Sequence, residues 1–450
     1  MSYSQKYSGW IHSGFFSGLQ KLSVPLSGLF ITIILAHKAL TKAEMGVWAL
    51  FMSITAIVEL IRQGLVKTAL IKYVNHSEPD EHKFVIGAAL FLNAGITIIT
   101  GLVMFILTPY FSVLLKAPAL KEMLYLLQIG LLIMIPFSHF EWLMYSKMQF
   151  KGLFWTYFFR QGLTLALVFL IFVVKTKIPL NMLVVIYNLA LIIATIVAYR
   201  FVKPFLKGSF IFSKQWALKL FHFGKYVFAS GLSTLVFRSA DQVMLSPMLG
   251  STTFNGSQNI AMRFLNLSDL PSQTLGDILF PKSAKSENSS NPSILKYYYE
   301  KTVGASLSIV LPLVTFVLIF PKAIIYILAG PQYYDAVPYL QIIALTSITL
   351  AFLKQYGVIM DSTGRPAINL ITITLLAVVQ VSSLYFFITH FGFIGAGYAL
   401  LLSHIIGFIC TQLLLNKLFK INFLNSFLYA FKFYPEFLKI ILEKLPWKKK

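Results

Sequence analysis

Long apolar runs alternate with short polar connections along almost the whole chain. Most runs reach about twenty residues, the length that an α-helix needs to cross the hydrocarbon core of a bilayer. They lack the two-residue alternation of barrel strands, and a backbone in lipid must pair its own polar groups. The pattern therefore predicts an all-α, polytopic integral membrane protein. We place about twelve transmembrane helices near residues 14–36, 46–70, 84–108, 120–144, 152–174, 179–201, 225–248, 256–280, 302–320, 337–359, 367–389 and 393–416.

The composition agrees with this pattern. Of 450 residues, 57% are hydrophobic and 12% charged, and soluble domains carry about twice that charged share. Met1 to Trp10 is polar, and no small-residue cleavage site follows the first apolar run, so we expect no cleavable signal peptide. The single cysteine, Cys410, lies inside an apolar run, which excludes a disulfide within one chain.

The charges of the connecting loops orient the predicted helices. Loops on the side of the N-terminus, with the C-terminal tail, carry 24 lysines and arginines, against 7 on the opposite side. Because positive loops stay inside, both termini are expected in the cytoplasm. The net charge of +22 is then explained by loops facing anionic lipid, and we expect no nucleic-acid partner. Residues 210–223 and the tail mix aromatics with lysines, which predicts interfacial amphipathic helices.

The two halves of the sequence resemble each other. The stretch Tyr125–Ile129 recurs as Tyr339–Ile343. Further matches fall at one constant offset: Gly46 with Gly256, Glu59 with Asp269, and Lys72 with Lys282. We therefore expect two six-helix lobes, 1–212 and 213–416, around a central cavity, followed by a basic amphipathic cytoplasmic tail, 417–450. Two parallel repeats of this kind are typical of transporters that work by alternating access.

Ionisable residues fall inside the predicted spans. Each costs at least about 2.5 kcal/mol near the bilayer centre unless it meets water or a partner. The basic ones are Lys21, Arg62, Lys67, Arg160, Arg238, Arg263 and Lys354, and the acidic ones are Glu59, Glu141, Asp241, Asp269 and Asp277. Snorkelling to a nearby cytoplasmic end explains four of them: Lys67, Glu141, Lys354 and Asp277. The excess of positive charge favours an anionic ligand such as a diphosphate, which guanidinium groups recognise well.

Spacing groups several of these residues on common helical faces. Glu59 with Arg62, and Arg238 with Asp241, are three residues apart, so each set forms either a neutralising pair or part of a polar cavity. A polar stripe follows the eighth span, which Pro271 interrupts. Such a stripe lines an aqueous path or another helix, and it comprises Asn259, Arg263, Asn266, Gln273 and Asp277, with Asp269 beside it.

Motifs for catalysis or cofactors are not found in the sequence. There is no glycine-rich phosphate loop, no His-Glu-x-x-His helix, and no metal-ligand spacing among the histidines. We therefore expect no cofactor, no metal and no enzymatic activity. A membrane glycan polymerase or ligase stays an alternative, although such enzymes usually have a large external loop and no external loop here exceeds about fifteen residues.

Three stretches carry a resemblance to a known family. They are Phe237–Leu245 (FRSADQVML), Asn259–Arg263 (NIAMR) and Leu279–Pro281 (LFP). They resemble the charged seventh span, the eighth span and its exit in the Wzx-type O-antigen flippases, the polysaccharide-transporter branch of the multidrug/oligosaccharidyl-lipid/polysaccharide (MOP) exporter superfamily. The resemblance covers residues 8–416. The family commonly has an aromatic pair before the eighth span, where this chain has Phe254-Asn255-Gly256.

This resemblance implies a flippase of the bacterial cell inner (cytoplasmic) membrane. Its cargo would be an undecaprenyl-diphosphate-linked oligosaccharide, the repeat unit of O-antigen, lipopolysaccharide or another surface polysaccharide, moved from the cytoplasmic to the periplasmic leaflet. The family's cationic cavity matches basic residues here, and its members are thought to couple to an ion gradient. We expect substrate binding at Lys21, Arg62, Arg160, Arg238 and Arg263, and coupling to H+ or Na+ at Glu59, Asp241 or Asp269.

The expected partners are the lipid-linked oligosaccharide, membrane lipids and other polysaccharide-assembly proteins. Two relatives within the superfamily stay open alongside the flippase of surface polysaccharide. A multidrug exporter would have an acid-dominated cavity for cationic drugs, which the positive excess here argues against. A lipid-II-type flippase for a cell-wall precursor would share the cationic cavity.

Overall fold

The computed structural model describes residues 23–175, 177–206, 211–284 and 291–444, the last nine of them by backbone only. These residues are helical, with short connections and no strand among them. The chain up to the middle of the sequence forms the apolar helix Ser23–Ala39, α2 (Lys42–Arg62), the π-helical η2 (Gln63–Lys67), α3 (Thr68–His76), α4 (His82–Leu114), α5 (Leu120–Ser146), α6 (Phe150–Val174) and α7 (Leu180–Val202). It continues with α8 (Lys214–Leu249), α9 (Thr253–Ser268), α10 (Leu270–Ala284), α12 (Pro292–Ile319), α13 (Pro321–Ala329), α14 (Ala336–Ser362), α15 (Pro366–Phe419) and α16 (Phe423–Lys444).

Eight of the described helices are long and apolar enough to cross a membrane. One of them, α15, holds two spans, because Gly392 adopts φ 61° and ψ −137° inside it. The rings of Phe387 and Tyr398 lie 6.2 Å apart, whereas eleven residues of straight helix would span about 16 Å. The chain therefore turns back at Gly392. With Ser23–Ala39, α8 and the α9–α10 pair, the described helices account for the predicted twelve spans, and the predicted all-α polytopic fold is confirmed.

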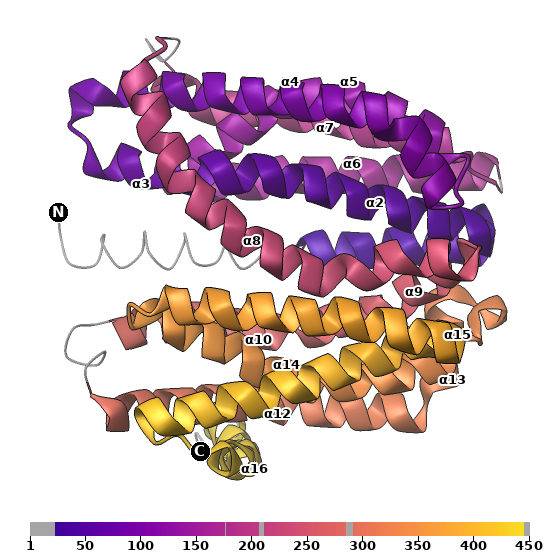
Figure 1. The fold of residues 1–450 in the computed structure, drawn as a ribbon, viewed down its shortest axis with the longest axis vertical. Coiled ribbons are helices and arrows are strands. Elements are labelled where there is room, and N and C mark those ends of the chain that lie inside the picture. The colour runs from indigo at the N-terminus through magenta and orange to yellow at the C-terminus, as the bar shows by residue number, and fades with distance from the viewer. Residues whose placement is uncertain (1–22, 176, 207–210, 285–290, 445–450) are drawn as a thin grey trace. The chain divides into compact units, whose positions relative to one another are not determined.

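Two compact units make up the chain. The first comprises residues Met1–Leu235, Leu245–Gly256 and Leu328–Gly330, and the second comprises Val236–Met244, Ser257–Ile327 and Pro331–Lys450. The long helix α8 contributes to both units, which are called unit 1 and unit 2 below. Within each unit the long helices run side by side (Figure 1). The lobe boundaries expected at residues 212 and 416 stay predictions.

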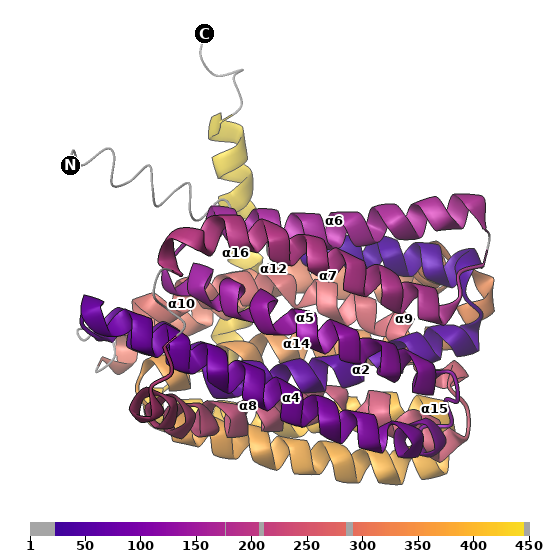
Figure 2. The same ribbon diagram turned by 90° about the horizontal axis from the view of Figure 1, so that it is seen from above.

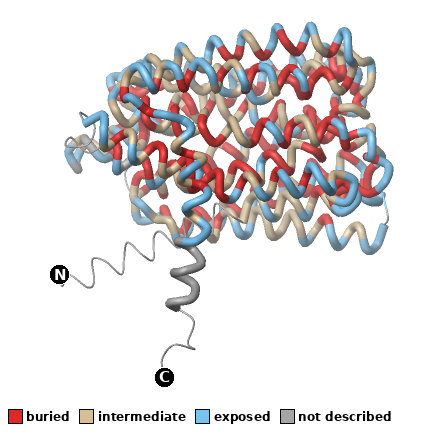
Figure 3. Tube along the Cα trace, turned by 90° about the horizontal axis from the view of Figure 1, so that it is seen from below, coloured by how far each residue is buried: buried red, intermediate tan, exposed pale blue. Residues whose placement is uncertain are grey.

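Each unit has its own apolar core. In unit 1 the core gathers Leu70, Trp142 and Leu220 from α3, α5 and α8. In unit 2 it gathers Val303, Phe352 and Phe419 from α12, α14 and α15. Large apolar side chains are also exposed on the outer faces of the helices, as the alternation of buried and exposed positions along each helix shows (Figure 3). In a bilayer such outward apolar faces meet lipid, so their exposure is expected.

The start of α8 corrects one expectation. Residues 210–223 were expected to form an interfacial amphipathic helix ahead of a seventh span that starts near 225. Residue 210 lies outside the described residues, and residues 214–223 form the first turns of α8, which continues without interruption into that span. Ser213 caps this helix by accepting a hydrogen bond from the backbone N–H of Trp216. Gly224 does not break the helix. A Cβ atom there would fall 1.9 Å from the carbonyl oxygen of Leu65, so the glycine permits a close approach of two backbones within unit 1.

Candidate functional site

A break between α9 and α10 lies at Asp269, two residues before Pro271. Proline has no N–H and disfavours helical geometry in the residue before it, which accounts for a break at this point. The backbone N–H of Asp269 still donates to Leu265 at 3.1 Å, and that of Gln273 donates to the carbonyl of Asp269 at 3.0 Å. The interruption predicted for the eighth span is confirmed, and it divides the predicted polar stripe between two helices.

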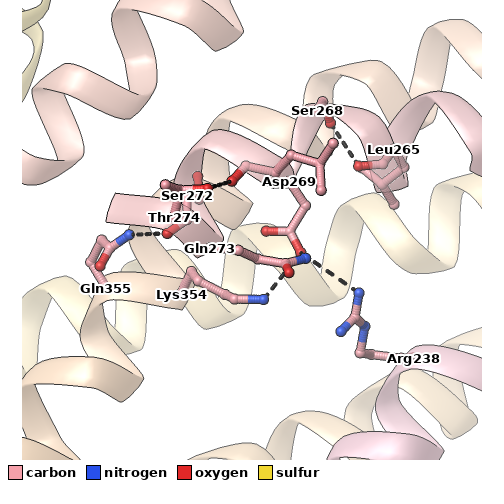
Figure 4. A network of polar contacts seen from close by, with 10 residues as sticks. Arg238, Leu265, Ser268, Asp269, Ser272, Gln273, Thr274, Lys354 and Gln355 are labelled. Atoms are coloured by element: carbon pink, nitrogen blue, oxygen red, sulfur yellow. Dashed lines mark hydrogen bonds and ion pairs between the residues drawn. The ribbon is translucent and has the colours of Figure 1, made fainter. Parts of the chain in front are cut away.

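The carboxylate of Asp269 forms ion pairs with two basic side chains within unit 2 (Figure 4). Its Oδ2 atom lies 3.1 Å from Nζ of Lys354 on α14 and 3.7 Å from Nη2 of Arg238 on α8. The amide of Gln273 donates to the same oxygen at 2.8 Å. The side chain of Asp269 is 1% exposed, whereas that of Arg238 is 50% exposed. The cluster therefore has one positive charge in excess, and its arginine is accessible.

Lys354 corrects a second expectation. It was assigned to snorkelling toward a cytoplasmic helix end, but its ammonium group is paired with Asp269. A buried carboxylate without a partner is strongly destabilising, and the flexible lysine stem lets the ammonium reach it from the neighbouring helix. Lys67 shows the same pattern in unit 1, where its Nζ lies 3.6 Å from Oε1 of Glu141.

Asp241 is held by donors other than Arg238. Its Oδ1 accepts from the backbone N–H of Gln242 at 2.8 Å, and its Oδ2 lies 3.5 Å from the hydroxyl of Tyr339 on α14. The carboxylate is buried, with 3% of the residue exposed. Arg238, three residues earlier, turns to Asp269 instead. The two charges on one helical face therefore serve different neighbours in unit 2.

Arg263 on α9 carries an unsatisfied donor. Its Nε atom is buried and has no hydrogen-bond partner among the described residues. A buried donor left without an acceptor costs about 1–3 kcal/mol. An anionic oxygen brought to this guanidinium would remove that cost, so Arg263 is a suitable binding group for a phosphate.

Arg160 lies in an aromatic and acidic setting in unit 1. Its Nη2 donates to the hydroxyl of Tyr187 at 2.8 Å and lies 3.9 Å from Oε1 of Glu59. The guanidinium carbon also lies 5.0 Å from the ring centre of Phe137 and 5.2 Å from that of Tyr187. Cation–π contacts of this kind stabilise a desolvated arginine. Glu59 therefore contacts an arginine from α6 rather than Arg62 on its own helix.

Arg62 is enclosed by neutral acceptors. Its Nε donates to Thr97 at 2.7 Å, and its Nη2 donates to Asn93 at 3.2 Å, to the Met134 carbonyl at 2.9 Å and to Ser138 at 3.0 Å. The residue is 1% exposed. Arg62 thereby ties α2 to α4 and α5 in the described conformation. Substrate binding by Arg62 stays a prediction, and Lys21, the remaining predicted binding residue, lies outside the described residues.

A second cluster in unit 1 surrounds Glu141. Its Oε1 accepts from the hydroxyl of Tyr157 at 2.9 Å, in addition to its ion pair with Lys67. Lys67 closes the π-helical turn η2, and its Nζ lies 4.4 Å from the ring centre of Tyr145. Sequence reasoning missed Tyr157 and Tyr187 as partners of the buried charges, because single aromatic residues in apolar helices give no spacing signal. Gln273 was found by spacing, as a member of the polar stripe beside Asp269. No group of three or more His, Cys, Asp or Glu side chains that could hold a metal occurs in the described parts of the chain.

Comparison with known families places the chain. Residues 34–338 match the family described as polysaccharide biosynthesis protein. The chain belongs to this family. The resemblance inferred from the seventh and eighth spans is thereby confirmed at the level of the family.

One curated relative is an uncharacterized membrane protein of Methanocaldococcus jannaschii. It is 30% identical over 231 residues, which are 51% of this chain and 46% of the relative. The match thus spans about half the length of that protein.

Comparison with solved structures shows which fold this chain has. It aligns with the lipid II flippase MurJ in an inward closed conformation with a TM-score of 0.77 and 12% identity, covering 96% of this chain and 93% of MurJ. An inward-facing multidrug-resistance MATE transporter of the MOP superfamily gives 0.76 and 15% identity, covering 90% and 99%. A MOP transporter from Pyrococcus furiosus, whose binding pocket is described as reversed in polarity, gives 0.62 and 15%, covering 90% and 95%. The fold is that of the MOP-superfamily transporters.

Proposed function

We propose that this protein is a flippase for an anionic, lipid-linked oligosaccharide. The observation that carries the proposal is the positive excess around Asp269, where Arg238 and Lys354 share one buried carboxylate and Arg238 is half exposed. The unsatisfied donor of Arg263 on the preceding helix adds a second place for an anionic oxygen. Membership of a polysaccharide biosynthesis family supports a glycan as the cargo.

The cargo we propose is an undecaprenyl-diphosphate-linked repeat unit of a surface polysaccharide. Phosphate oxygens are strong acceptors for arginine, and a diphosphate offers enough of them for several cations at once. Arg238, Arg263 and Lys354 are the proposed contacts from unit 2, and Lys21, Arg62 and Arg160 are proposed from the N-terminal half. The polyprenyl chain stays in lipid while the lobes 1–212 and 213–416 alternate in access.

Exchange of partners at Asp269 gives a route to coupling. A diphosphate that takes over Arg238 and Lys354 leaves a buried carboxylate that needs another positive partner. A proton or Na+ at Asp269 would meet that need, since its Oδ1 atom has no hydrogen-bond partner among the described residues. Asp241 and Glu59 are the alternative coupling sites, and both have partners inside their own unit.

The proposed setting is the bacterial inner membrane, with both termini in the cytoplasm. It rests on the excess of lysine and arginine in the loops of the N-terminal side. The cargo then moves from the cytoplasmic to the periplasmic leaflet, where other polysaccharide-assembly proteins receive it. A multidrug exporter for cations fits less well, because cationic ligands would be repelled by an accessible Arg238.

Deletion of the gene in its host tests the proposal. Lipid-linked oligosaccharide should accumulate in the cytoplasmic leaflet, as measured on spheroplasts with a glycan probe that cannot cross the membrane. The wild-type gene and the control Lys175→Gln should restore external labelling, and Arg238→Ala should not, at equal protein levels in the membrane. Normal export by Arg238→Ala would refute the role of this residue. Unchanged sidedness with shortened surface glycan would indicate a polymerase, and unchanged glycans of every kind would favour drug export.

A further inference from the structure

The C-terminal helix α16 is held by one face of α12. Three residues spaced by four on α12, Glu300, Gly304 and Ser308, all contact it. Oε1 of Glu300 accepts from the backbone N–H of Asn422 at 2.9 Å, and Oε2 accepts from the side-chain amide of Asn425 at 3.1 Å. Glu300 is 2% exposed. A carboxylate at a helix N-terminus satisfies free N–H groups and interacts favourably with the helix dipole, so Glu300 fixes the start of α16.

Gly304 is required by the closeness of the two helices. A Cβ atom at this position would fall 2.5 Å from Cβ of Tyr429 and 2.8 Å from the carbonyl oxygen of Ser426. Only glycine allows this approach without displacement of α16. One turn further along α12, the carbonyl of Ser308 accepts from the hydroxyl of Tyr434 at 2.6 Å. Between Asn422 and Tyr434, α16 is therefore docked on α12 at several points rather than attached by its first residue alone.

Aromatic side chains complete the inner face of α16. The ring of Phe427 lies 5.8 Å from that of Phe352 on α14, and the ring of Phe423 lies 5.5 Å from that of Phe408 on α15. Helix α16 thus contacts three helices of unit 2. Its position is built into the fold of this unit.

The opposite face of α16 is apolar and exposed. Leu424 is 56% exposed, Leu428 59% and Phe431 65%, and steps of four and three place them on one helical face. Exposed Lys432 follows directly. The sequence beyond adds Lys439, Lys444, Trp447 and three final lysines, and only Glu436 and Glu443 oppose them. An apolar stripe with neighbouring lysines is the pattern of a helix that lies in the interface of an anionic membrane.

The direction of α16 agrees with such a position. It runs across the direction of the long helices of its unit (Figure 2), whereas those helices cross the membrane. It meets α12 between Glu300 and Ser308, close to residue 302, where the hydrophobic pattern begins the corresponding span. With those helices across the bilayer, this direction would place α16 along the membrane plane near the boundary between headgroups and acyl chains.

We propose that the outer face of α16 binds anionic phospholipids of the leaflet that faces the termini. Leu424, Leu428 and Phe431 enter the acyl region, and Lys432 contacts the phosphate groups. The sequence beyond Lys432 adds further positive charge. The occupant is a lipid surface rather than a protein. The apolar residues followed by lysine match the acyl chains and the anionic phosphate groups next to them in a leaflet. The inference rests on the orientation proposed above and does not depend on the flippase activity.

Hydrogen–deuterium exchange on the full-length protein tests this inference. The protein is placed in nanodiscs of phosphatidylcholine alone or with 30% phosphatidylglycerol, and exchange of residues 423–444 is followed by mass spectrometry. Each lysine near an anionic surface contributes about 1 kcal/mol, so exchange should slow by about fivefold per engaged lysine in the anionic discs. The variant Lys432→Gln/Lys439→Gln should lose most of this difference, and low salt should enlarge it.

The control variant is Lys175→Gln/Lys177→Gln, which removes two exposed lysines from the opposite side of the membrane and should behave as wild type. Exchange of α16 that is equal in the two kinds of disc would overturn the proposal and leave the stripe to a protein partner. A lipid-dependent difference that persists in Lys432→Gln/Lys439→Gln would overturn the role of the lysines. Both readouts are independent of transport, so loss of the proposed flippase function would not alter them.

Discussion

Two arginines on membrane-spanning helices, one in each unit, differ in how their hydrogen-bond donors are satisfied. In unit 1, Arg62 donates four hydrogen bonds to neutral oxygens and is 1% exposed. In unit 2, Arg238 lies 3.7 Å from the carboxylate of Asp269, which also pairs with Lys354. Half of the Arg238 side chain is exposed. The first arrangement fixes helices in place. The second leaves an accessible guanidinium group, as the proposed binding and release of an anionic cargo require.

The largest effect should come from Arg62. Replacement by leucine leaves the oxygens of Asn93, Thr97, Ser138 and Met134 without their donor. We expect loss of about 3–5 kcal/mol of stability, comparable to breaking a buried charged network. Thermal unfolding in detergent and the amount of protein in the membrane check this. Normal stability of Arg62→Leu would contradict the structural role. Transport lost at normal stability would leave Arg62 only its proposed role in binding the cargo.

Lys354 should have an intermediate effect. Lys354→Met leaves the carboxylate of Asp269 with the hydrogen bond from Gln273 and with Arg238, at the longer distance of 3.7 Å, as its remaining ion-pair partner. We expect a loss of about 1–3 kcal/mol. The double variant Lys354→Met/Asp269→Asn should regain part of that loss, because the uncompensated charge is removed. Unfolding of the four proteins of this cycle gives the coupling energy. Additive losses would show that the two groups do not interact.

Tyr187→Phe should have the smallest effect of the three. It removes one hydrogen bond of 2.8 Å to Arg160 but keeps the ring beneath the guanidinium. We expect a loss of about 0.5–1.5 kcal/mol. Tyr187→Leu, which also removes the cation–π contact, serves as the comparison and should lose more. Equal losses in the two variants would show that the ring contributes nothing beyond its hydroxyl.

The hydrophobic pattern was sufficient for the fold because lipid imposes long helices. It also placed the break near Pro271, since proline cannot continue the hydrogen-bond ladder. The pattern did not reveal that α8 begins at Lys214. An interfacial helix and the first turns of a spanning helix can have the same mixture of aromatic residues and lysines, so the sequence does not distinguish them.

The sequence predicted which charged residues belong to the candidate site, but not which of them form ion pairs with each other. The position of a charge inside a span singled out Arg238, Asp269 and Glu59. Spacing along one helix left open a neutralising pair or a polar cavity, and the pairs within one helix are not the ion pairs that form. Glu59 contacts Arg160, and Arg238 contacts Asp269, because packing brings these helices together within each unit. Lys354 was assigned to snorkelling because it lies about two turns from the cytoplasmic end of its predicted span. Its partner Asp269 lies on another part of the chain, and spacing along one helix cannot reveal such a contact.

The most direct test of an exchangeable cation in unit 2 is a flipping assay with purified protein in liposomes. The substrate is a polyprenyl-diphosphate oligosaccharide, and external glycan is measured over time with an impermeant probe. We expect Arg238→Gln to slow translocation by about tenfold to a hundredfold, the value of a charged hydrogen bond, while Lys175→Gln moves the substrate as fast as wild type. Wild-type rates in Arg238→Gln, with the protein folded and inserted, would contradict the proposed cationic site.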